Sequence, residues 1–435
     1  MRQTYCSYIS ALNGKEITVI GIGVSNRPLI RMLCQSGARV TARDMHEPID
    51  REEWEFLGVK LCLGENYLQG LGGDIIYRTP GLRPDHPGLE YARACGCTVT
   101  SEMNDFFSLC PCPIYGITGS DGKTTTTTLI AEILRADGNT VHLGGNIGTP
   151  LLTRVGEISP EDLCVVELSS FQLMDMQYAP HTAVITNISP NHLDWHKDMD
   201  EYISAKKKIL DFKPSRAVLN RDNAVTSGLS PIAEETLWFG KHMIKNDIIN
   251  GILPVSEIKL RGWHNVENFM AAMTALNERV SSDSIRKTAS YFSGVAHRDE
   301  LVAKVNGVSY YNDSIGSSPS RTVATLLSHP GRVHLIAGGR DKNVPFDILA
   351  ERMPKHVKCL YLIGEASEQI EKASRRVTAG MPIVRCENLE QAVSEALKRT
   401  SPGDTVLLSP ACTSFDQYKN FEERGEHFKR LVKAM

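Results

Sequence analysis

The segment from residue 113 to residue 136 restricts the fold more than any other part of the chain. An apolar, strand-like run at 113–118 leads into the loop GSDGKT, and the residues after the loop predict a helix to about residue 136. A strand that enters a tight turn and continues into a helix is half of a βαβ unit, and such units build parallel sheets. The segment therefore predicts an α/β protein.

The glycines of this loop have an unusual spacing. The common phosphate-binding loop is G-x-x-x-x-G-K-[ST], but Ile117 stands where its first glycine is expected, and the pattern here is G-x-x-G-K-T from Gly119 to Thr124. In such a loop backbone N–H groups bind phosphates, the Lys123 ammonium reaches the β- and γ-phosphates, and the Thr124 hydroxyl ligates Mg²⁺. The sequence G-K-T at a helix start favours this interpretation over a turn without a ligand.

Strand-like runs recur along the chain in three groups. They lie at 16–23, 39–44, 74–81 and 98–102, then at 113–118, 163–168, 181–188 and 216–220, and finally near 331–339, 358–364 and 404–411, with helices expected at 25–36 and from about 263. The proline-punctuated stretch 110–114 suggests a linker, and 293–302 a second boundary. We predict three α/β domains in series, at 1–109, 110–295 and 296–435.

Composition indicates an ordinary soluble protein. The 435 residues are 41% hydrophobic and 23% charged, and the formal net charge is −3. This charge gives no support for a nucleic-acid or membrane partner, and no apolar run is long enough to span a bilayer. The N-terminus has no long apolar segment of the secretory type, so a cytoplasmic location is expected.

Eleven cysteines are scattered through the sequence. The close pairs, Cys95/Cys97 and Cys110/Cys112, are both C-x-C, and neither has the spacing of a zinc site with a second pair or with histidines. This pattern favours reduced thiols over a metal or disulfide framework.

A second glycine turn follows the first strand. Gly21 and Gly23 begin a G-x-G-x-x-G pattern whose third glycine is replaced by Asn26, and Asp44 ends the next strand, where a dinucleotide-binding fold has its ribose-binding acid. A partial pattern is a weak signal. A dinucleotide, another nucleotide diphosphate bound at the helix N-terminus, and a turn without a ligand all remain open.

Other candidates follow the strands of the second group. Glu167 ends the run LCVVE, which places its carboxylate at the carboxyl end of a strand, where open α/β sheets bind ligands. His192 follows the next strand, where a hydrogen-bonded loop histidine is an equal alternative. The pair His192/His196 resembles a metal clip, but no helix is evident there. Lys206 begins a lysine run that by itself indicates a solvated helix face.

These residues belong to motifs that occur in order along almost the whole chain. The motifs are GITGSDGKTTT (116–126), GGNIG (144–148), ELSSFQL (167–173), NISPNHLDWH (187–196), EYISAKKKIL (201–210), GWHNVEN (262–268), AHRDE (296–300), NDSIGSSP (312–319), GGRDKNVPF (338–346) and LLSPACTSFDQYKNFEERG (407–425). Together they resemble the Mur ligases. The G-x-x-G-K-T loop marks this superfamily, which also includes the folylpolyglutamate synthases, and the resemblance accounts for the displaced glycines.

The resemblance implies a fold and a reaction. It implies a Rossmann-like domain for a UDP-linked substrate, a central P-loop ATPase-type domain with a parallel sheet, and a C-terminal Rossmann-like domain for an amino acid. The last motif is particular to the members that add D-glutamate, so the implied reaction is the ATP-dependent joining of D-glutamate to UDP-MurNAc-L-alanine through an acyl phosphate. It also implies ATP, two Mg²⁺ ions and a CO₂-derived carbamate on Lys206, small-molecule partners only, and a monomer.

The resemblance also assigns individual residues. It implies catalytic roles for Lys123, His192 and Lys206; ATP contacts from Gly119, Ser120, Asp121, Gly122, Lys123, Thr124, Thr125, Asn265, Asn268, Arg298 and Asp313; metal ligation by Thr124, Glu167, His192 and Lys206; and substrate contacts from Val24, Ser25, Thr79, Asn146, Lys342, Ser414 and Phe421. Ile315 replaces a lysine that many relatives have, and the stretch Arg43-Asp44-Met45-His46 has no match to the uridine-binding residues of some members.

Three alternatives remain at this stage. The first is another ligase of the same superfamily, which the C-terminal third disfavours. The second is an NAD-dependent oxidoreductase built on Gly21, Gly23 and Asp44, which leaves residues 115–128 unexplained. The third is a non-catalytic nucleotide-binding protein, against which the presence of Lys123 and Glu167 argues.

Overall fold

The computed structural model describes residues 4–23, 26–48, 51–192, 195–260, 262–341, 344–378 and 380–435. The chain forms two compact units, Met1–Phe292 and Ser293–Met435, and each is described by itself. In the described ranges no helix is long and apolar enough to cross a membrane. The three-domain boundaries expected from the sequence stay a prediction.

The first unit begins with a five-stranded parallel sheet. Its order is β3-β2-β1-β4-β5, from β1 (Glu16–Ile20), β2 (Arg39–Asp44), β3 (Lys60–Leu63), β4 (Ile75–Tyr77) and β5 (Thr98–Thr100). The accompanying helices are α1 (Tyr5–Leu12), α2 (Asn26–Gln35), α3 (Arg51–Phe56), α4 (Pro87–Ala94) and α5 (Glu102–Leu109). The expected strand–helix alternation of a parallel, wound sheet is confirmed here.

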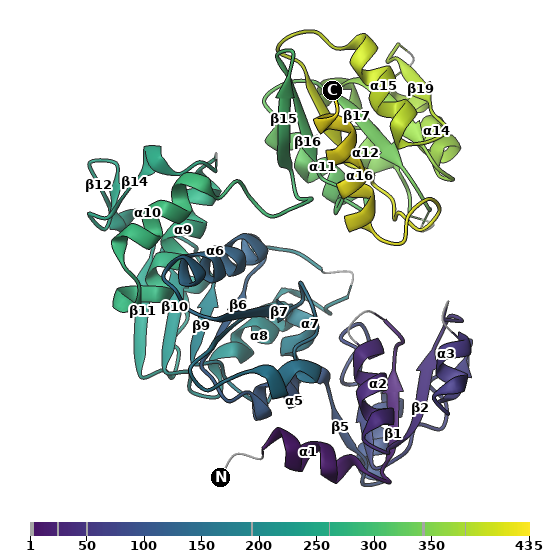
Figure 1. Ribbon diagram of the computed structural model, residues 1–435, viewed down its shortest axis with the longest axis vertical. Coiled ribbons are helices and arrows are strands. Elements are labelled where there is room, and N and C mark those ends of the chain that lie inside the picture. The colour runs from purple at the N-terminus through teal and green to yellow at the C-terminus, as the bar shows by residue number, and fades with distance from the viewer. Residues whose placement is uncertain are drawn as a thin grey trace. The chain divides into compact units, whose positions relative to one another are not determined.

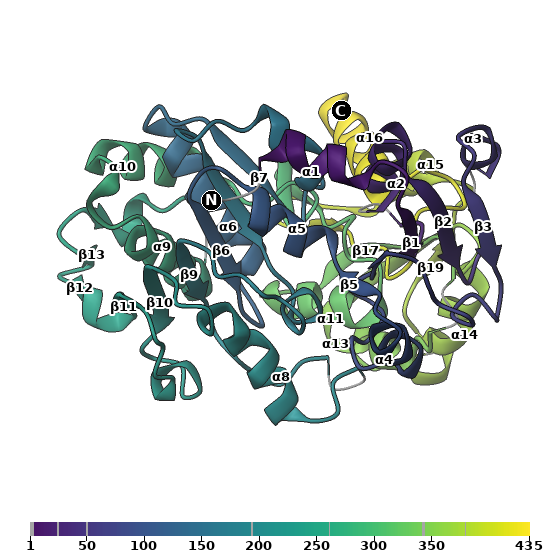
Figure 2. The ribbon, with the colours of Figure 1, turned by 90° about the horizontal axis from the view of Figure 1, so that it is seen from below.

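A six-stranded parallel sheet follows in the same unit. Its order is β11-β10-β9-β6-β8-β7, from β6 (Ile114–Thr118), β7 (Val141–Gly145), β8 (Leu163–Glu167), β9 (Thr182–Ile185), β10 (Arg216–Asn220) and β11 (Glu235–Phe239). Figure 2 shows β9, β10 and β11 side by side. A small antiparallel sheet joins β12 (Ile244–Lys245), β13 (Ile248–Ile249) and β14 (Leu253–Pro254).

Helices cover both faces of the six-stranded sheet (Figure 1). They are α6 (Lys123–Ala136), α9 (Trp263–Leu276) and α10 (Ser282–Tyr291) on one face, and α5, α7 (Ser170–Leu173) and α8 (Met199–Lys207) on the other. Neighbouring residues of one strand therefore enter different cores: Val165 packs with α6 and α9, whereas Cys164 and Val166 pack on the opposite face. The sequence of a strand that is buried on both faces is a continuous apolar run, and for this reason LCVVE predicts a strand.

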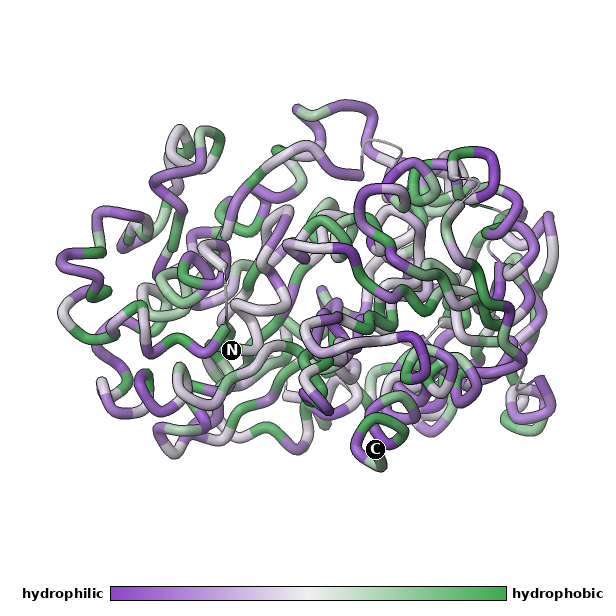
Figure 3. The backbone as a smooth tube through the Cα atoms, turned by 90° about the horizontal axis from the view of Figure 1, so that it is seen from above, coloured by the Kyte–Doolittle hydropathy of each residue, from purple (hydrophilic) through white to green (hydrophobic). Residues whose placement is uncertain are grey.

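The two sheets of the first unit share one hydrophobic cluster. The short 3₁₀ helix η1 (Leu152–Glu157) belongs to the second sheet's part of the chain, yet its Leu152 and Val155 pack with α1, α2 and α5. Hydrophobic and hydrophilic stretches alternate along the chain (Figure 3), and the central strands β6, β8 and β9 are buried at every position. The shared cluster explains why residues 1–292 form a single compact unit.

The second unit is a six-stranded sheet in the order β15-β16-β20-β17-β18-β19. Its strands are β15 (Glu300–Val305), β16 (Val308–Asn312), β17 (Val333–Gly338), β18 (Val357–Ile363), β19 (Ile383–Arg385) and β20 (Thr405–Leu408). All neighbours are parallel except β15 and β16. The helices are α11 (Pro319–Ser328), α12 (Asp347–Ala350), α13 (Met353–His356), α14 (Ser367–Val377), α15 (Leu389–Arg399) and α16 (Phe421–Lys433). The predicted fold class, α/β with parallel sheets, is confirmed.

Candidate active site

The loop between β6 and α6 has the backbone that a phosphate site requires. Gly119 and Gly122 have φ angles of 151° and 77°, and Gly122 forms the N-cap of α6 with no side-chain hydrogen bond to the helix. A helix start without a side-chain cap leaves backbone N–H groups available to an anion. A side chain at Gly122 would collide with the Asn268 amide, and one at Gly119 with the Thr186 hydroxyl. The glycines are therefore required both by backbone angle and by space.

Two lysines meet at one carbonyl of this loop. Lys123 Nζ donates to the carbonyl oxygens of Gly119 and Ser120 at 2.9 and 2.8 Å, and Lys206 Nζ donates to the same Gly119 oxygen at 2.7 Å. Lys206 lies on α8 with only 1% of its surface exposed, so the sequence pattern of a solvated lysine run does not hold for it. The structure thus brings together two of the three predicted catalytic residues, which are 83 positions apart in the sequence.

The environment of Lys206 favours the neutral amine. Burial, followed by the nearby charge of Lys123, lowers the pKa of Lys206 from 10.5 to about 6, against smaller opposing effects of Asp121 and Glu167. Desolvation disfavours a charged group, and a like charge adds to the effect. The lowered pKa favours the unprotonated amine, which is the nucleophilic form.

Glu167 is placed to hold a cation. Its carboxylate ends β8, is 1% exposed, and accepts a hydrogen bond through Oε1 from the Asn146 side-chain amide at 2.8 Å. The other oxygen, Oε2, is buried without a hydrogen-bond partner among the described residues. A buried, unsatisfied carboxylate oxygen is costly, and Mg²⁺ prefers such hard oxygen ligands. Together with the buried Thr124 at the start of α6, the donor set fits the predicted Mg²⁺.

His192 lies in an exposed turn after β9. Its backbone has a φ of 54°, and its ring packs edge-on against Phe171 at 5.1 Å. His196 is instead buried and forms a 2.9 Å hydrogen bond with the Ser170 hydroxyl. The two rings therefore have different environments, which argues against a two-histidine clip, and the metal role of His192 stays a prediction.

The predicted adenine-side residues lie on α9. The Asn268 amide donates to Asn265 Oδ1 at 3.2 Å, and its own oxygen accepts from the Thr126 hydroxyl at 3.2 Å. These bonds connect the start of α9 to the first turns of α6, next to Gly122. The structure thus places Asn268 beside the phosphate loop, and the contact of either asparagine with adenine stays a prediction.

The N-terminal glycine turn is held by its own side chains. Asp44 Oδ2 accepts a hydrogen bond from the Ile22 backbone N–H at 2.7 Å, and Oδ1 accepts one from His46. Asn26, which replaces the third glycine, donates to the carbonyls of Ile20 and Gly21 at 3.0 and 2.9 Å. The Asp44 carboxylate therefore stabilises the turn, which weakens the dinucleotide interpretation. Thr79 lies beside Gly21, whereas the predicted contacts Val24 and Ser25 lie outside the described residues.

In the second unit, predicted residues follow the carboxyl ends of strands. Asp313 comes directly after β16 and is buried; its Oδ2 accepts from the Ser409 and Thr325 hydroxyls at 2.6 and 2.8 Å. Burial raises the pKa of Asp313 to about 6. These bonds give it a structural function in the unit, and its nucleotide contact stays a prediction.

Three other predicted site residues of this unit are described. Arg298 precedes β15, Ser414 follows β20, and Phe421 begins α16. Ser414 is buried, Arg298 is partly exposed, and Phe421 is the first residue of α16, with its ring edge-on to His297 at 6.1 Å. Lys342 lies outside the described residues. The roles assigned to these residues stay predictions.

Sequence reasoning missed three residues that shape the loop. The Thr186 hydroxyl and the Asn187 amide both donate to the Asp121 carbonyl, at 2.6 and 3.1 Å. The Tyr202 hydroxyl lies 2.9 Å from Ser120 Oγ, and its ring lies 4.7 Å from Lys206 Nζ. The signal for Thr186 and Asn187 is their position directly after β9, at the carboxyl end of a strand of the parallel sheet.

Fold and site together define a class of protein: a multi-sheet α/β protein with a phosphate-binding loop, a buried carboxylate and a buried neutral lysine. Residues 117–276 match the Mur ligase middle domain, and residues 297–412 match the Mur ligase, glutamate ligase domain. The chain belongs to the Mur ligase family. The resemblance found in the sequence is thereby confirmed.

Individual relatives support this assignment along the full length. The chain is 47% identical to UDP-N-acetylmuramoylalanine–D-glutamate ligase of Clostridium kluyveri over 458 residues, covering 100% of both chains. It is 46% identical to the protein of the same name from Acetivibrio thermocellus, covering 98% of this chain and 97% of the other. The solved UDP-N-acetylmuramate-alanine ligase of Thermotoga maritima, at 16% identity and a TM-score of 0.58 with 97% and 99% covered, shares the fold.

Proposed function

We propose that the protein is an ATP-dependent ligase that joins D-glutamate to UDP-N-acetylmuramoyl-L-alanine in peptidoglycan precursor synthesis. The full-length similarity to ligases of that name carries the proposal. The phosphate loop with Lys123, Glu167 and neutral Lys206 supplies the chemistry that such a ligase needs. We place the reaction in the cytoplasm, where ATP is available, and expect a monomer.

A carboxylate must be activated before an amine can displace one of its oxygens. A carboxylate oxygen of the nucleotide substrate attacks the γ-phosphorus of ATP, ADP leaves, and an acyl phosphate forms. The amine of D-glutamate then attacks the acyl carbon, phosphate leaves with the bonding electrons, and the amine loses a proton. The acyl phosphate has phosphate as its leaving group, which water could also displace, so the site must exclude water until the amine arrives.

Positioning and neutralisation of charge are the tasks of the protein in the first step. The Lys123 ammonium would bind the β- and γ-phosphates of ATP, and the backbone N–H groups at the start of α6 would donate hydrogen bonds to the same phosphates. Thr124, Glu167 and His192 would hold two Mg²⁺ ions, which neutralise the phosphate oxygens. Asn265, Asn268, Arg298 and Asp313 would complete the nucleotide site, and Thr79, Asn146, Lys342, Ser414 and Phe421 the substrate sites.

The carbamate is the finer part of the proposal. The neutral Lys206 amine attacks CO₂, forms an N–C bond and releases one proton, which leaves an anionic carbamate in place of the neutral amine. Its oxygens are of the type that Mg²⁺ prefers. The lowered pKa of Lys206 supports this step, because only the unprotonated amine reacts.

Phosphate release is the measurement that tests the function. Purified protein with Mg-ATP and UDP-N-acetylmuramoyl-L-alanine is given a panel of D- and L-amino acids. We expect release that requires both the nucleotide substrate and D-glutamate. Release with a different amino acid would keep the family and overturn the choice of acceptor. Absence of release with every acceptor, together with tight ATP binding, would favour a regulatory protein instead.

Lys206→Ala tests the carbamate, and Lys207→Ala is its matched control because Lys207 is the exposed neighbour on the same helix. We expect Lys206→Ala to lose activity and to regain part of it with a short-chain carboxylic acid that fills the vacated space. Lys207→Ala should keep the wild-type rate. Loss of activity that no acid restores would contradict the carbamate on Lys206. It would not contradict the proposed ligase reaction.

A further inference from the structure

Three cysteines of the first unit lie in mutual contact on the face of the six-stranded sheet that carries α5. Cys110 and Cys112 flank Pro111 after the end of α5, and Cys164 is the second residue of β8. The Sγ–Sγ distances are 3.7 Å between Cys110 and Cys112, 3.7 Å between Cys110 and Cys164, and 3.5 Å between Cys112 and Cys164. All three are buried and none forms a disulfide. We call these residues the thiol cluster.

The spacing of the thiol cluster is close to that of a zinc site. A Zn–S bond is about 2.3 Å, so two sulfurs on a tetrahedral ion lie about 3.8 Å apart. The three sulfurs therefore need to separate by only a few tenths of an ångström to surround an ion. A disulfide would join two of them and leave the third unused, whereas the near-equal spacing suits a ligand that all three share.

The backbone around the thiol cluster is already fixed. Cys164 N donates to the Pro113 carbonyl at 3.1 Å, and Ile114 pairs with Cys164 in the parallel ladder of β6 and β8. The C-x-C segment is thus held against β8 on the strand side, and α5 holds it on the other. A ligand set on such a frame is organised before the ion arrives, which reduces the ordering that binding requires.

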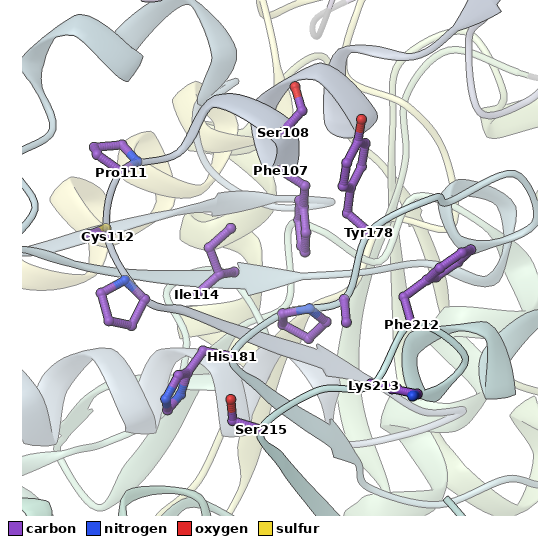
Figure 4. A pocket seen from close by; sticks show the side chains of 13 residues that line it. Phe107, Ser108, Pro111, Cys112, Ile114, Tyr178, His181, Phe212, Lys213 and Ser215 are labelled. Atoms are coloured by element: carbon purple, nitrogen blue, oxygen red, sulfur yellow. The ribbon is translucent and has the colours of Figure 1, made fainter. Parts of the chain in front are cut away.

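A pocket reaches the thiol cluster at Cys112. It has a volume of about 520 Å³, and Cys112 is among the residues that line it. Figure 4 shows Phe107, Tyr178 and Phe212 around the pocket. The pocket lies at the amino ends of β6, β9 and β10, whereas the phosphate loop follows the carboxyl end of β6. The thiol cluster is therefore separate from the nucleotide site.

We propose that Cys110, Cys112 and Cys164 form a three-thiolate site for a soft divalent ion of the zinc class, with a solvent molecule from the pocket as the fourth ligand. Each S–H bond is replaced by an S–metal bond, so three protons leave for each ion bound and no electron is transferred. Because a thiol must lose its proton before its sulfur can bind the ion, affinity increases with pH.

The test is a titration of reduced, metal-free full-length protein with Cd²⁺ in excess Mg²⁺. Cadmium bound to thiolates gives a ligand-to-metal charge-transfer band that carboxylate and imidazole ligands do not give, so binding near Glu167 or His192 is distinguished. We expect one thiolate-bound Cd²⁺ per chain, release of three protons, and displacement by Zn²⁺. A wild-type titration without the band overturns the proposal, whatever the variants do.

Variants locate the site. Cys112→Ser and Cys164→Ser each remove one ligand and should lose the band. Cys359→Ser is the matched control, because Cys359 is also buried but lies on β18 of the second unit. Each variant is first melted by circular dichroism to confirm that it folds. A folded Cys164→Ser protein that keeps the full band places the ion elsewhere and contradicts the proposal.

Discussion

At the scale of single residues, the Gly119 carbonyl organises the site. It accepts hydrogen bonds from both the half-buried Lys123 and the buried Lys206, so the two amines are held close together. Two adjacent ammonium groups repel, and the more deeply buried one is the one that gives up its proton. One backbone oxygen thus holds two chemically identical side chains in different surroundings, and the more buried of them, Lys206, has the lowered pKa.

The lowered pKa of Lys206 makes folding stability depend on pH. Between the folded value of about 6 and the ordinary value of 10.5, the unfolded chain binds a proton that the folded chain does not. Stability therefore rises with pH in this window, by at most about 1.4 kcal/mol per pH unit. We expect wild type to gain stability over Lys206→Met between about pH 7 and pH 9.

Urea unfolding at several pH values, in CO₂-free buffer without nucleotide, measures this difference. The variant supplies the baseline, since every other titrating group is shared. Parallel stability curves for the two proteins across that range would show that Lys206 is protonated in the folded state and would contradict its assignment as a neutral amine.

The candidate site residues that are easiest to recognise from the sequence are those that lie next to one another in the chain. Gly119, Gly122, Lys123 and Thr124 form a site by themselves once a strand precedes them and a helix follows. Tyr202 and Cys164 could not be found this way, because their partners Ser120 and Cys112 are 82 and 52 residues away. Contacts of that range depend on how strands are ordered in the sheet, which local patterns do not contain.

At the scale of elements, most of the strands that the sequence did not predict lie at sheet edges, although β16 lies inside its sheet. Five of them, β3, β7, β11, β15 and β19, are edge strands, and their residues are mainly half-buried or exposed. The central strands β6, β8 and β9 are buried at every position. An edge strand needs no continuous apolar run, so its sequence resembles a loop. The sequence predicts the parallel architecture, but it does not predict the number of strands in each sheet.

The start of α6 gives a prediction at this scale. Gly122 has a positive φ and no room for a side chain beside Asn268, whereas Gly138, just after the end of the same helix, has a φ of 89° and open space around it. Alanine at either position costs about 1 kcal/mol for the backbone angle. We expect Gly122→Ala to lose more stability than Gly138→Ala and to lose ATP-dependent activity as well.

Thermal unfolding and phosphate release on both variants measure these effects. The loss of stability in Gly138→Ala measures the cost of the backbone angle alone. The additional loss of stability in Gly122→Ala measures the collision with Asn268. Equal losses of stability, with activity retained in both, would show that the loop relaxes to admit a side chain and is not held rigid as described.

At the scale of the whole molecule, a buried ion pair connects the two sheets of the first unit. Arg78, next to the end of β4, donates to both carboxylate oxygens of Asp175 at 2.8 and 2.6 Å, and its side chain is fully buried. Removing one partner leaves an uncompensated buried charge, which typically costs about 3–5 kcal/mol. We expect Arg78→Ala to destabilise the first unit by about this amount.

Arg51→Ala is the control, because the ion pairs that Arg51 forms with Glu47 and Glu55 are exposed. Such pairs contribute little, so its unfolding midpoint should match that of wild type. Denaturant unfolding followed by fluorescence compares the variants. Similar midpoints for Arg78→Ala and Arg51→Ala would mean that the buried pair does not join the sheets.

Catalysis predicts a movement of the whole molecule. The phosphate loop belongs to the first unit, and the residues assigned to D-glutamate, including Ser414 and Phe421, belong to the second. Under the proposed function the acyl phosphate reacts with the amine of D-glutamate, so we expect ATP with the nucleotide substrate to bring the units together. Small-angle scattering should report a smaller radius of gyration with both ligands present than with neither; identical profiles would refute closure.

The cluster shared by the two sheets of the first unit has a consequence for synthesis on the ribosome. Residues 1–109 contain a complete sheet, but Leu152 and Val155, which pack on its helices, are made later. Until then the nascent chain exposes apolar side chains that the finished protein covers, and exposed apolar surface promotes aggregation. The first sheet therefore depends on continued translation, and a ribosome that stalls near residue 109 would release a fragment prone to associate with other chains.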